Sequence, residues 1–466
     1  MNPHPVLSPA PPTGERRRSR YARPLFVTAA AIAAAAALPV GAAAASAAKP
    51  KTTKAKTATP APVLSNATVP RPTPTGIETL LGWYDTTWEA VKKENWGLTG
   101  QTQIVATRTF ALAFGAAEEA AANVEQPKPG NGTLALARQA AIAFAIHDTL
   151  VSLTPRAKAL VDQQLDATIN SLPEGTKLNG PRNAGEAAAA SWTTKRLGDG
   201  LDLPTINRPF NIPAPTNGVW RLTSPGTLPV QAGQGAAQPF LVKNVAGKFI
   251  APEPPAIDSP EVIADLNEIA SLGSLNSALR GPERTQIARF WSQTSVAGYV
   301  SILRDVLTRD TRSPRELAHI VKVFHEVTGD AQIAVYASKY RYLRWRPVTA
   351  LTTDDGNPNT PFVKGWTPLI TTPAHPEYPS GHVGYAAAAE VALQTFFGKT
   401  PAKPVRAQST VFPGVFTAYT TWGEITDDNV NARVWSGIHL RSTDNISRKY
   451  GYKIARAALR AAGELK

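Results

Sequence analysis

Lys339 and Arg346 are the first pair of side chains in this sequence whose spacing suits a chemical task. They fall seven residues apart on one predicted helix, which places both on the same face, two turns apart. Pro347 follows directly, near the end of that helix. Such a pair could bind an anion. Because Arg341 and Arg344 lie between them, however, a solvated basic face explains the pair better when it is taken alone.

The block Pro379-Ser380-Gly381-His382 precedes a predicted helix over Val383–Phe397. Ser380 is a natural N-cap residue, and Gly381 lets a ligand approach the backbone closely. The N–H groups and the dipole at a helix N-terminus favour a bound anion. His382 would stand beside that anion as a proton donor or acceptor. An ordinary capped helix with a surface histidine explains this block equally well.

A third block runs from Arg433 to His439 and combines a guanidinium with a second histidine. Arginine suits an oxyanion because it donates two parallel hydrogen bonds. His439 could coordinate the central atom of that anion or attack it. The alternative is a loop with unrelated charges.

In this order, the motifs Lys-x6-Arg-Pro, Pro-Ser-Gly-His and Arg-x5-His resemble the three-part signature of one superfamily, the type-2 phosphatidic acid phosphatases and vanadium haloperoxidases. Five upstream segments resemble landmarks of secreted bacterial haloperoxidase-like proteins: Trp83-Tyr84-Asp85, Ala145-Ile146-His147-Asp148, Gly218-Val219-Trp220-Arg221, Arg289-Phe290-Trp291 and Asp330-Ala331. The resemblance covers most of residues 76–466.

The resemblance implies a role for each matching residue. Vanadate would be the cofactor, and its oxygens would be hydrogen-bonded by Lys339, Arg346, Ser380, Gly381 and Arg433. His439 would be the axial vanadium ligand, and His382 would be the acid–base residue for peroxide, which Lys339 would help to activate. The superfamily often has an Asp four residues after the second histidine. Here that position is Thr443, with Asp444 one residue later, so the group that orients His439 stays open.

Electrostatics favour an anion site independently of the resemblance. Lys339, Arg346 and Arg433 would bring three fixed positive charges into one small volume, which is costly without a compensating multivalent anion. Vanadate and phosphate are near-isosteric tetrahedral anions, so these residues alone do not choose between them.

His375 lies five residues before Ser380, in a segment whose prolines predict an extended backbone against the site. In the family, the matching position tends to be Phe in chloroperoxidases and His in bromoperoxidases. A histidine there would change which groups beside the peroxide can donate or accept a proton. Bromide is oxidised more easily than chloride, so the resemblance implies a preference for bromide. The alternative is a surface loop histidine.

Two enzyme classes share this constellation. A vanadium-dependent haloperoxidase would use hydrogen peroxide to oxidise halide to hypohalous acid, which halogenates small organic acceptors. A secreted acid phosphatase would use His439 as nucleophile and His382 as general acid. A protein that only sequesters the anion would need neither histidine, and is disfavoured.

Three features favour the haloperoxidase. The upstream landmarks match that branch, and the series of membrane-spanning helices expected of a membrane phosphatase is not found. The chain has no cysteine and one methionine, Met1. A chain without sulfur tolerates a strong oxidant, although drift in a chain rich in Ala and Pro explains this composition at least as well.

The elements that must position these residues are predicted to be helical. Apolar residues recur at three- and four-residue steps over residues 107–124, 133–153, 155–171, 260–279, 283–310, 314–328, 331–344, 382–397 and 445–465. No strand alternation is long enough to argue for a sheet. Residues 201–256 are Pro-rich and irregular, as in a long surface connection. The sequence therefore predicts an all-α fold in which residues 76–466 form one large domain of two packed bundles. Residues 76–256 hold the N-terminal helices and the Pro-rich connection, and residues 257–466 form the C-terminal bundle with the oxyanion site.

The N-terminal residues predict export. A basic segment at residues 16–23 precedes an apolar run at residues 25–38 and a small-residue cleavage site, Ala45-Ser46-Ala47. This order predicts a signal peptide over residues 1–47 and a secreted protein that is not an integral membrane protein once processed. Residues 48–75 have the Lys/Ala/Thr/Pro composition of a disordered linker. An uncleaved anchor is the alternative, but the apolar run is short for a bilayer.

The net charge of +14 is concentrated at the N-terminus. Residues 1–75 carry a net +9, which leaves +5 for residues 76–466. No dense basic stripe with interleaved aromatic residues follows, so a nucleic-acid partner is disfavoured.

Overall fold

The computed structural model describes residues 76–95, 103–128, 130 and 133–466. The predicted signal peptide (residues 1–47) and linker (residues 48–75) lie outside these residues and stay predictions.

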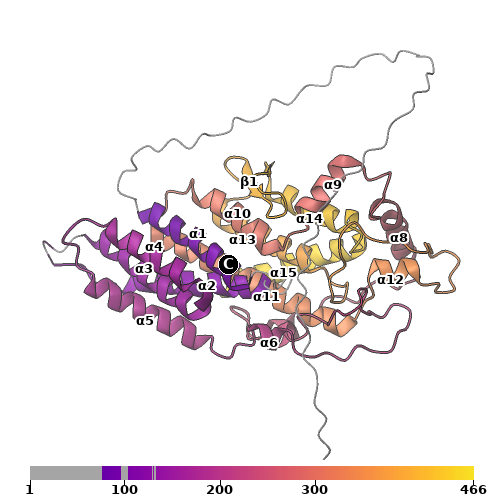
Figure 1. The fold of residues 1–466 in the computed structure, drawn as a ribbon, viewed down its shortest axis with the longest axis horizontal. Helices are drawn as coiled ribbons and strands as arrows, with labels where there is room; N and C mark the ends of the chain where they lie inside the picture. The colour runs from indigo at the N-terminus through magenta and orange to yellow at the C-terminus, as the bar shows by residue number, and fades with distance from the viewer. Residues whose placement is uncertain (1–75, 96–102, 129, 131–132) are drawn as a thin grey trace, which may run out of the picture. The chain divides into compact units, whose positions relative to one another are not determined.

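The described residues are mainly helical, which confirms the all-α fold class (Figure 1). The first half contains α1 (Gly76–Asn95), α2 (Gln103–Asn123), α3 (Leu134–Leu153), the 3-10 helix η1 (Pro155–Ala157), α4 (Lys158–Asn170), α5 (Asn179–Lys195), α6 (Leu203–Ile206), η2 (Gln234–Ala236) and α7 (Val245–Lys248). The second half contains α8 (Pro260–Leu272), α9 (Gly281–Phe290), α10 (Ser295–Leu307), α11 (Pro314–Tyr342), α12 (Pro347–Thr352), α13 (Gly381–Phe397), α14 (Trp422–Trp435) and α15 (Arg441–Ala461). A short antiparallel pair, β1 (Val405–Gln408) and β2 (Phe416–Tyr419), is a difference from the strand-free expectation.

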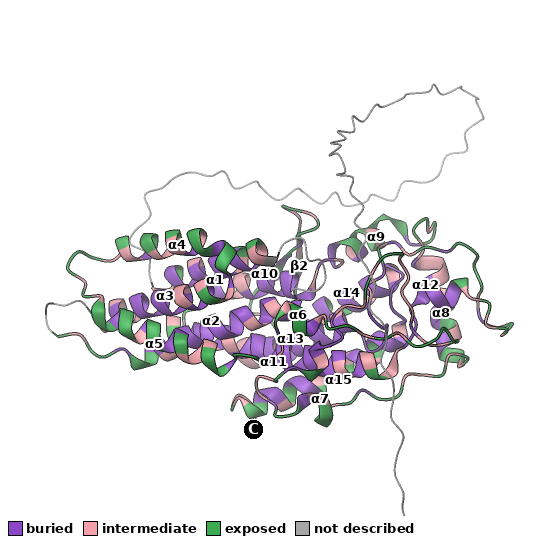
Figure 2. Cartoon of the chain, turned by 60° about the horizontal axis from the view of Figure 1, so that its bottom comes forward, coloured by how far each residue is buried: buried purple, intermediate pink, exposed green. Residues whose placement is uncertain are grey.

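The long helix α11 connects the two groups of helices. It packs against α2 on one side and against α13 and α15 on the other. Figure 2 shows the buried residues concentrated on α2, α11 and α13, whereas α4 and α5 expose one face to solvent. A capping box of Ser313 and Glu316 starts α11, Pro314 occupies its first turn, and left-handed Leu343 ends it. Lys339 is therefore held in the last turn of a well-anchored helix.

The break predicted between residues 328 and 331 is wrong, because α11 is continuous there. A Cβ on Gly329 would lie 2.6 Å from the Phe240 ring, so this glycine allows close packing and does not make a turn. The Asp330 carboxylate accepts hydrogen bonds from the backbone N–H groups of Phe240, Leu241 and Val242 at 2.6, 3.1 and 2.7 Å. Asp330 thus ties the Pro-rich connection to α11.

The single helix predicted over residues 283–310 is also wrong, because the structure divides it into α9 and α10. The link contains Trp291 and Gln293. The Gln293 side chain donates to the Gln408 carbonyl at 3.0 Å and accepts from the Thr410 N–H at 2.9 Å. This irregular link brings backbone carbonyls to the site described below.

One helix within the described ranges, α3, is long and apolar enough to cross a membrane by length and composition alone. In this structure α3 packs against α2 and α5, and 61% of its most apolar stretch is buried inside the protein. A helix in the core of a protein can have the same length and apolar composition, and the contacts of α3 fit such a helix.

Candidate active site

A cavity of about 890 Å³ collects most of the predicted site residues. The predicted residues that line it are His375, Gly381, His382, Arg433 and His439. Lys339, Arg346 and Ser380 are buried outside this lining, and each contacts segments that form the site. The structure therefore brings the three sequence blocks together.

Lys339 and Arg346 hold the loop before α13. The Lys339 ammonium donates to the carbonyls of Pro376 and Glu377, both at 2.9 Å. The Arg346 guanidinium donates to the His375 carbonyl at 3.0 Å. Burial lowers the pKa of Arg346 to about 10, which leaves it charged at neutral pH. These two cations are interior groups, so the solvated basic face does not occur.

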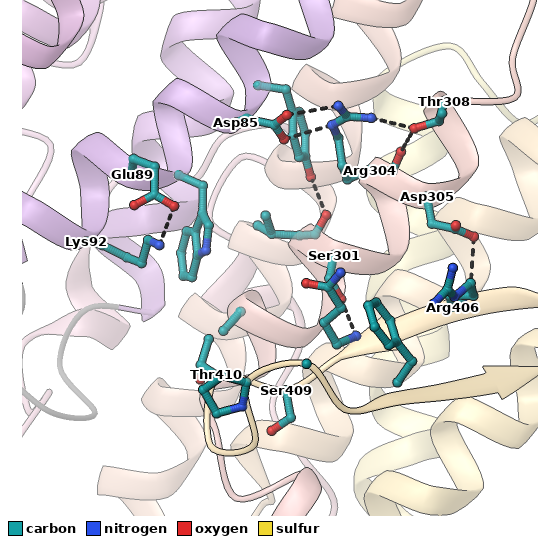
Figure 3. Close-up of a pocket in the computed structure, with 18 of the residues that line it drawn as sticks. Asp85, Glu89, Lys92, Ser301, Arg304, Asp305, Thr308, Arg406, Ser409 and Thr410 are labelled. Atoms are coloured by element: carbon teal, nitrogen blue, oxygen red, sulfur yellow. Dashed lines mark hydrogen bonds and ion pairs between the residues drawn. The ribbon is translucent and has the colours of Figure 1, made fainter. Parts of the chain in front are cut away.

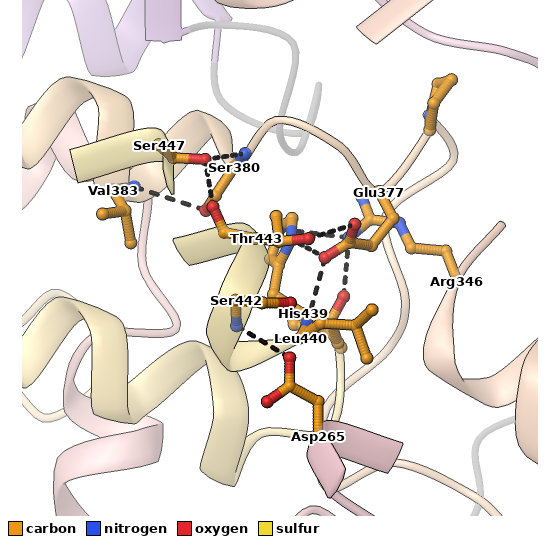
Figure 4. A network of polar contacts seen from close by, with 12 residues as sticks. Asp265, Arg346, Glu377, Ser380, Val383, His439, Leu440, Ser442, Thr443 and Ser447 are labelled. Atoms are coloured by element: carbon orange, nitrogen blue, oxygen red, sulfur yellow. Dashed lines mark hydrogen bonds and ion pairs between the residues drawn. The ribbon is translucent and has the colours of Figure 1, made fainter. Parts of the chain in front are cut away.

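Ser380 caps α13, as its residue type predicted. Its hydroxyl accepts the Val383 N–H at 3.4 Å, and its own N–H donates to the Ser447 hydroxyl at 2.7 Å (Figure 4). Gly381 lines the cavity directly after this cap. A Cβ at Gly381 would occupy that space, so the glycine keeps the helix N-terminus open to a ligand.

His439 is oriented by Glu377, a residue that the sequence analysis did not identify. Its Nδ1 lies 2.9 Å from the Glu377 carboxylate, which also accepts the Leu440 N–H at 3.0 Å and the Thr443 hydroxyl at 2.9 Å (Figure 4). Because the carboxylate accepts, Nδ1 carries the proton and Nε2 keeps its lone pair. The Arg346 guanidinium lies 3.2 Å from that Nε2.

This arrangement answers the question that Thr443 left open. Thr443 occupies the position where the superfamily often has an Asp. Its hydroxyl donates to the Glu377 carboxylate, which orients His439 in place of that Asp. The only feature of the sequence that pointed to Glu377 was its position three residues before Ser380, inside a Pro-rich loop. Burial together with Arg346 and Lys339 holds the pKa of His439 well below 6.5, which favours the neutral ring.

Asp444 is a second buried carboxylate beside the site. Burial raises the pKa of Asp444 well above 3.8, whereas the Ser380 hydroxyl and Arg433 lower it. Glu377 and Asp444 lie close enough to Lys339, Arg346 and Arg433 to interact with them electrostatically. The expectation that a multivalent anion compensates these three positive charges stays a prediction.

His382 is anchored through its Nε2, which lies 2.8 Å from the Gln293 carbonyl. A carbonyl only accepts, so Nε2 carries the proton and Nδ1 has the lone pair of the neutral ring. Burial and the nearby Arg433 hold the pKa of His382 well below 6.5. His382 is therefore a neutral proton acceptor in the wall of the cavity, and it is not a surface histidine.

Arg433 belongs to α14 and not to a loop. One terminal nitrogen donates to the Trp291 carbonyl at 3.2 Å. Its Nε is buried and has no hydrogen-bond partner among the described residues. A buried donor without a partner is costly, and an oxyanion in the adjoining cavity would satisfy it.

His375 is buried, so the surface-loop alternative is wrong. Its Nδ1 lies 3.0 Å from the Arg346 guanidinium, and its Nε2 lies 3.5 Å from the Tyr336 hydroxyl. The remaining described histidines, His147, His319 and His325, do not line the cavity.

A second cavity of about 1040 Å³ lies next to the first but holds none of the predicted site residues (Figure 3). The two cavities share Trp88, Lys92, Ala297 and Thr410. Several charged groups in the second cavity are already paired, such as Arg304 with Asp85 at 2.7 Å. The second cavity is therefore a groove whose walls carry both acidic and basic side chains.

No group of three or more His, Cys, Asp or Glu side chains in the described ranges is arranged to hold a metal ion. The cavity instead offers neutral histidine rings, His439 among them, beside Arg433 and the N-terminus of α13. This set fits a central atom that brings its own oxygen ligands.

Residues 319–465 match the family model described as the VCPO second helical-bundle domain. Three solved structures of bacterial enzymes share the fold. One, described as the first bacterial vanadium-dependent iodoperoxidase, is 20% identical with a TM-score of 0.66, and the match covers 82% of this chain and 96% of that one. An apo bacterial vanadium-dependent chloroperoxidase is 18% identical with a TM-score of 0.61, covering 78% and 94% of the two chains. A holo form of such a chloroperoxidase is 18% identical with a TM-score of 0.59, covering 81% and 97%.

No curated protein matches the chain in sequence. The fold and the family model agree with each other and with the three motifs. The chain therefore has the helical-bundle fold of the bacterial vanadium-dependent haloperoxidases, and its residues 319–465 carry their second helical-bundle domain.

Proposed function

We propose that this protein is a vanadium-dependent haloperoxidase that uses hydrogen peroxide to oxidise halide, with bromide favoured over chloride, and so halogenates small organic acceptors. The observation that carries the proposal is the cavity in which His439, whose Nδ1 is bound to Glu377, lies beside Arg433, His382 and the N-terminus of α13. A tetrahedral oxyanion fits this donor set, and the likeness in fold to vanadium-dependent enzymes favours vanadate over phosphate.

The residues present fit a bound vanadate by their chemistry. His439 would coordinate the vanadium through Nε2, and Lys339, Arg346, Ser380, Gly381 and Arg433 would bind its oxygens. Bound vanadate supplies a Lewis acid that polarises peroxide without changing its own redox state. His382 would accept the peroxide proton at Nδ1 and return a proton to the leaving oxygen, because its Nε2–H is fixed on Gln293.

A phosphatase remains the second candidate, because the Glu377–His439 pair would also orient a histidine nucleophile. In that reaction the Nε2 lone pair would attack phosphorus, and His382 would first have to gain a proton on Nδ1 in order to protonate the leaving oxygen. One comparison separates the two functions. Purified protein is incubated with orthovanadate, bromide, peroxide and a phenol-type bromination dye, beside a phosphatase assay without vanadate. We expect vanadate-dependent bromination, and phosphatase turnover without bromination would overturn the proposal.

Replacing Glu377 with Gln should weaken vanadate binding by roughly 10–100-fold, the usual effect of losing a group that orients a metal-binding histidine. The neutral amide no longer stabilises the Nδ1–H of His439 as the carboxylate does. Titration of bromination rate against vanadate concentration measures the loss. Glu390→Gln is the matched control, because Glu390 is a buried glutamate that binds Thr426 and Tyr452 outside the cavity. Equal vanadate affinities for Glu377→Gln and wild type would contradict the orienting role.

Replacing His375 with Phe should raise the chloride-to-bromide activity ratio several-fold. The substitution removes a polar ring from the cavity and frees the Arg346 donor that His375 now engages. A freed cation beside the peroxide site should activate it toward the halide that is harder to oxidise. Initial rates with each halide at fixed peroxide give the ratio. If wild-type protein oxidises chloride as fast as bromide, or the ratio does not change, His375 does not set halide choice.

We also propose export with cleavage near Ala47, from the basic, apolar and small-residue order of residues 16–47. N-terminal sequencing of protein collected outside expressing cells should begin close to residue 48. Mature protein that keeps residues 1–47 would rule out cleavage at this site.

A further inference from the structure

A directional chain of hydrogen bonds ends on His375, and it begins in the Pro-rich connection. Gln234 donates through Nε2 to the Gln332 backbone carbonyl at 3.2 Å. A backbone carbonyl can only accept, so the Gln234 amide has one orientation, with its Oε1 turned away. Gln231 donates its Nε2 to that Oε1 at 3.0 Å. This second contact fixes the Gln231 amide in turn.

The donor–acceptor direction set at Gln231 also determines the hydrogen bonds of Tyr336. The Gln231 Oε1 must accept, and the Tyr336 hydroxyl donates to it at 2.8 Å. The only proton of that hydroxyl is then used, so its oxygen can only accept from His375 Nε2, 3.5 Å away. On the other side of the ring, the Arg346 guanidinium donates to Nδ1 at 3.0 Å. Both neighbours therefore require the same tautomer of His375.

The opposite tautomer has one partner only. A proton on Nδ1 could reach the Pro376 carbonyl at 3.1 Å, but it would also face the Arg346 guanidinium. That carbonyl already accepts from Lys339. The Nδ1–H form thus places two donors against each other and leaves the Tyr336 oxygen without a proton to accept.

Gln231 adopts a backbone conformation that non-glycine residues rarely use, with a φ of 63°. Such a conformation persists where surrounding contacts impose it, and it often marks a functional position. Here the Gln231 N–H donates to the Asn207 side chain at 2.9 Å, and the Val230 N–H donates to the Ala374 carbonyl at 3.0 Å. The segment that carries Gln231 is thus attached to the backbone just before His375.

We propose that Gln231, acting through Tyr336, is a positioning residue that fixes His375 as a neutral Nε2–H donor directed at a halide ion in the cavity. All three side chains line that cavity. The 3.5 Å contact with Tyr336 is a long, weak hydrogen bond, so it adds to the selection of the tautomer by Arg346 while the His375 proton stays available to an anion. The halide part of this inference rests on the proposed function, whereas the tautomer part stands on the geometry alone.

The tautomer is measured on the full chain without vanadate, labelled with ¹⁵N-histidine and assigned with His375→Phe. The ring nitrogen shifts report which nitrogen carries the proton. We expect wild-type His375 to be protonated on Nε2 only. Gln231→Met removes the acceptor for Tyr336, so a population with Nδ1–H should appear. Gln231→Glu loses the donor to Gln234 but keeps an acceptor for Tyr336, so it should keep the wild-type tautomer. Gln103→Met is the matched control, since Gln103 also lines the cavity but accepts from Ser295.

The kinetic arm uses the vanadate-loaded protein. Gln231→Met should raise the KM for bromide by roughly tenfold with little change in kcat, as expected for loss of a donor to a charged ligand. Gln103→Met should stay near the wild-type KM. Wild-type His375 with a proton on Nδ1 would overturn the inference, and this reading needs no variant to fold. An unchanged tautomer or an unchanged bromide KM in Gln231→Met would overturn it as well. Absence of bromination in wild type would instead contradict the proposed function. The tautomer measurement would then decide by itself whether Gln231 positions His375.

Discussion

Replacing His439 with Ala is expected to remove vanadate binding and halogenation together. The substitution takes away the imidazole that would coordinate vanadium, while Arg346 and Arg433 still attract anions. Loss of a Lewis acid that contributes several kcal/mol should lower the bromination rate by roughly 10³-fold or more. Equilibrium dialysis for bound vanadium and the bromination assay measure the two effects on the same sample.

The control for this variant is His147→Ala. His147 lies on α3, where it contacts Asp148 and Asp162 outside the cavity. That protein should bind vanadate and turn over as wild type does. If His439→Ala keeps full activity, the role of His439 as the vanadium ligand is wrong.

Replacing His382 with Ala should separate binding from turnover. The variant loses the proton acceptor but keeps His439, Arg346 and Arg433, so vanadate should still bind. Turnover should fall by roughly 10²–10⁴-fold, the range for removal of a general acid–base group. Bound vanadium near the wild-type level together with this rate loss is the expected pair of results. A variant that loses vanadium and activity in equal measure would assign His382 to binding instead.

The motif residues could be predicted from the sequence because each block is short and local. A cap, a glycine and a histidine in a row place three functional groups at one helix start whatever the rest of the fold does. In the same way, the helical ranges with a clear apolar face were predicted, since burial against a neighbour imposes that periodicity.

Helix α14, one of the helices that were not predicted, lacks such a signal. Helix α14 packs against α9, α13 and α15, and it buries polar side chains such as Thr426, Asn429 and Arg433. A helix enclosed by protein on several sides has no solvated face, so its polar and apolar residues do not segregate. For this reason no helix was predicted around Arg433, and a loop stayed the alternative there.

The groups that orient the site were missed for another reason. Glu377 reaches His439 across 62 residues, and Gln231 reaches Tyr336 across 105 residues. Nothing local distinguishes a buried glutamine or glutamate from an exposed one, because only the folded chain provides the partner. Tyr336 alone had a local signal, since it lies one helical turn before Lys339.

The central claim, that His439 and the surrounding cations bind vanadate for halide oxidation, is tested most directly by a single titration. Protein freed of bound anion is titrated with orthovanadate while bound vanadium and bromination rate are followed on the same samples, with and without excess phosphate. We predict that no bromination occurs before vanadate is added. Rate and bound vanadium should then rise together to one vanadium per chain, and phosphate should shift both curves to higher vanadate concentration. Saturation with vanadium without any bromination, or bromination that does not depend on added vanadate, would contradict the account.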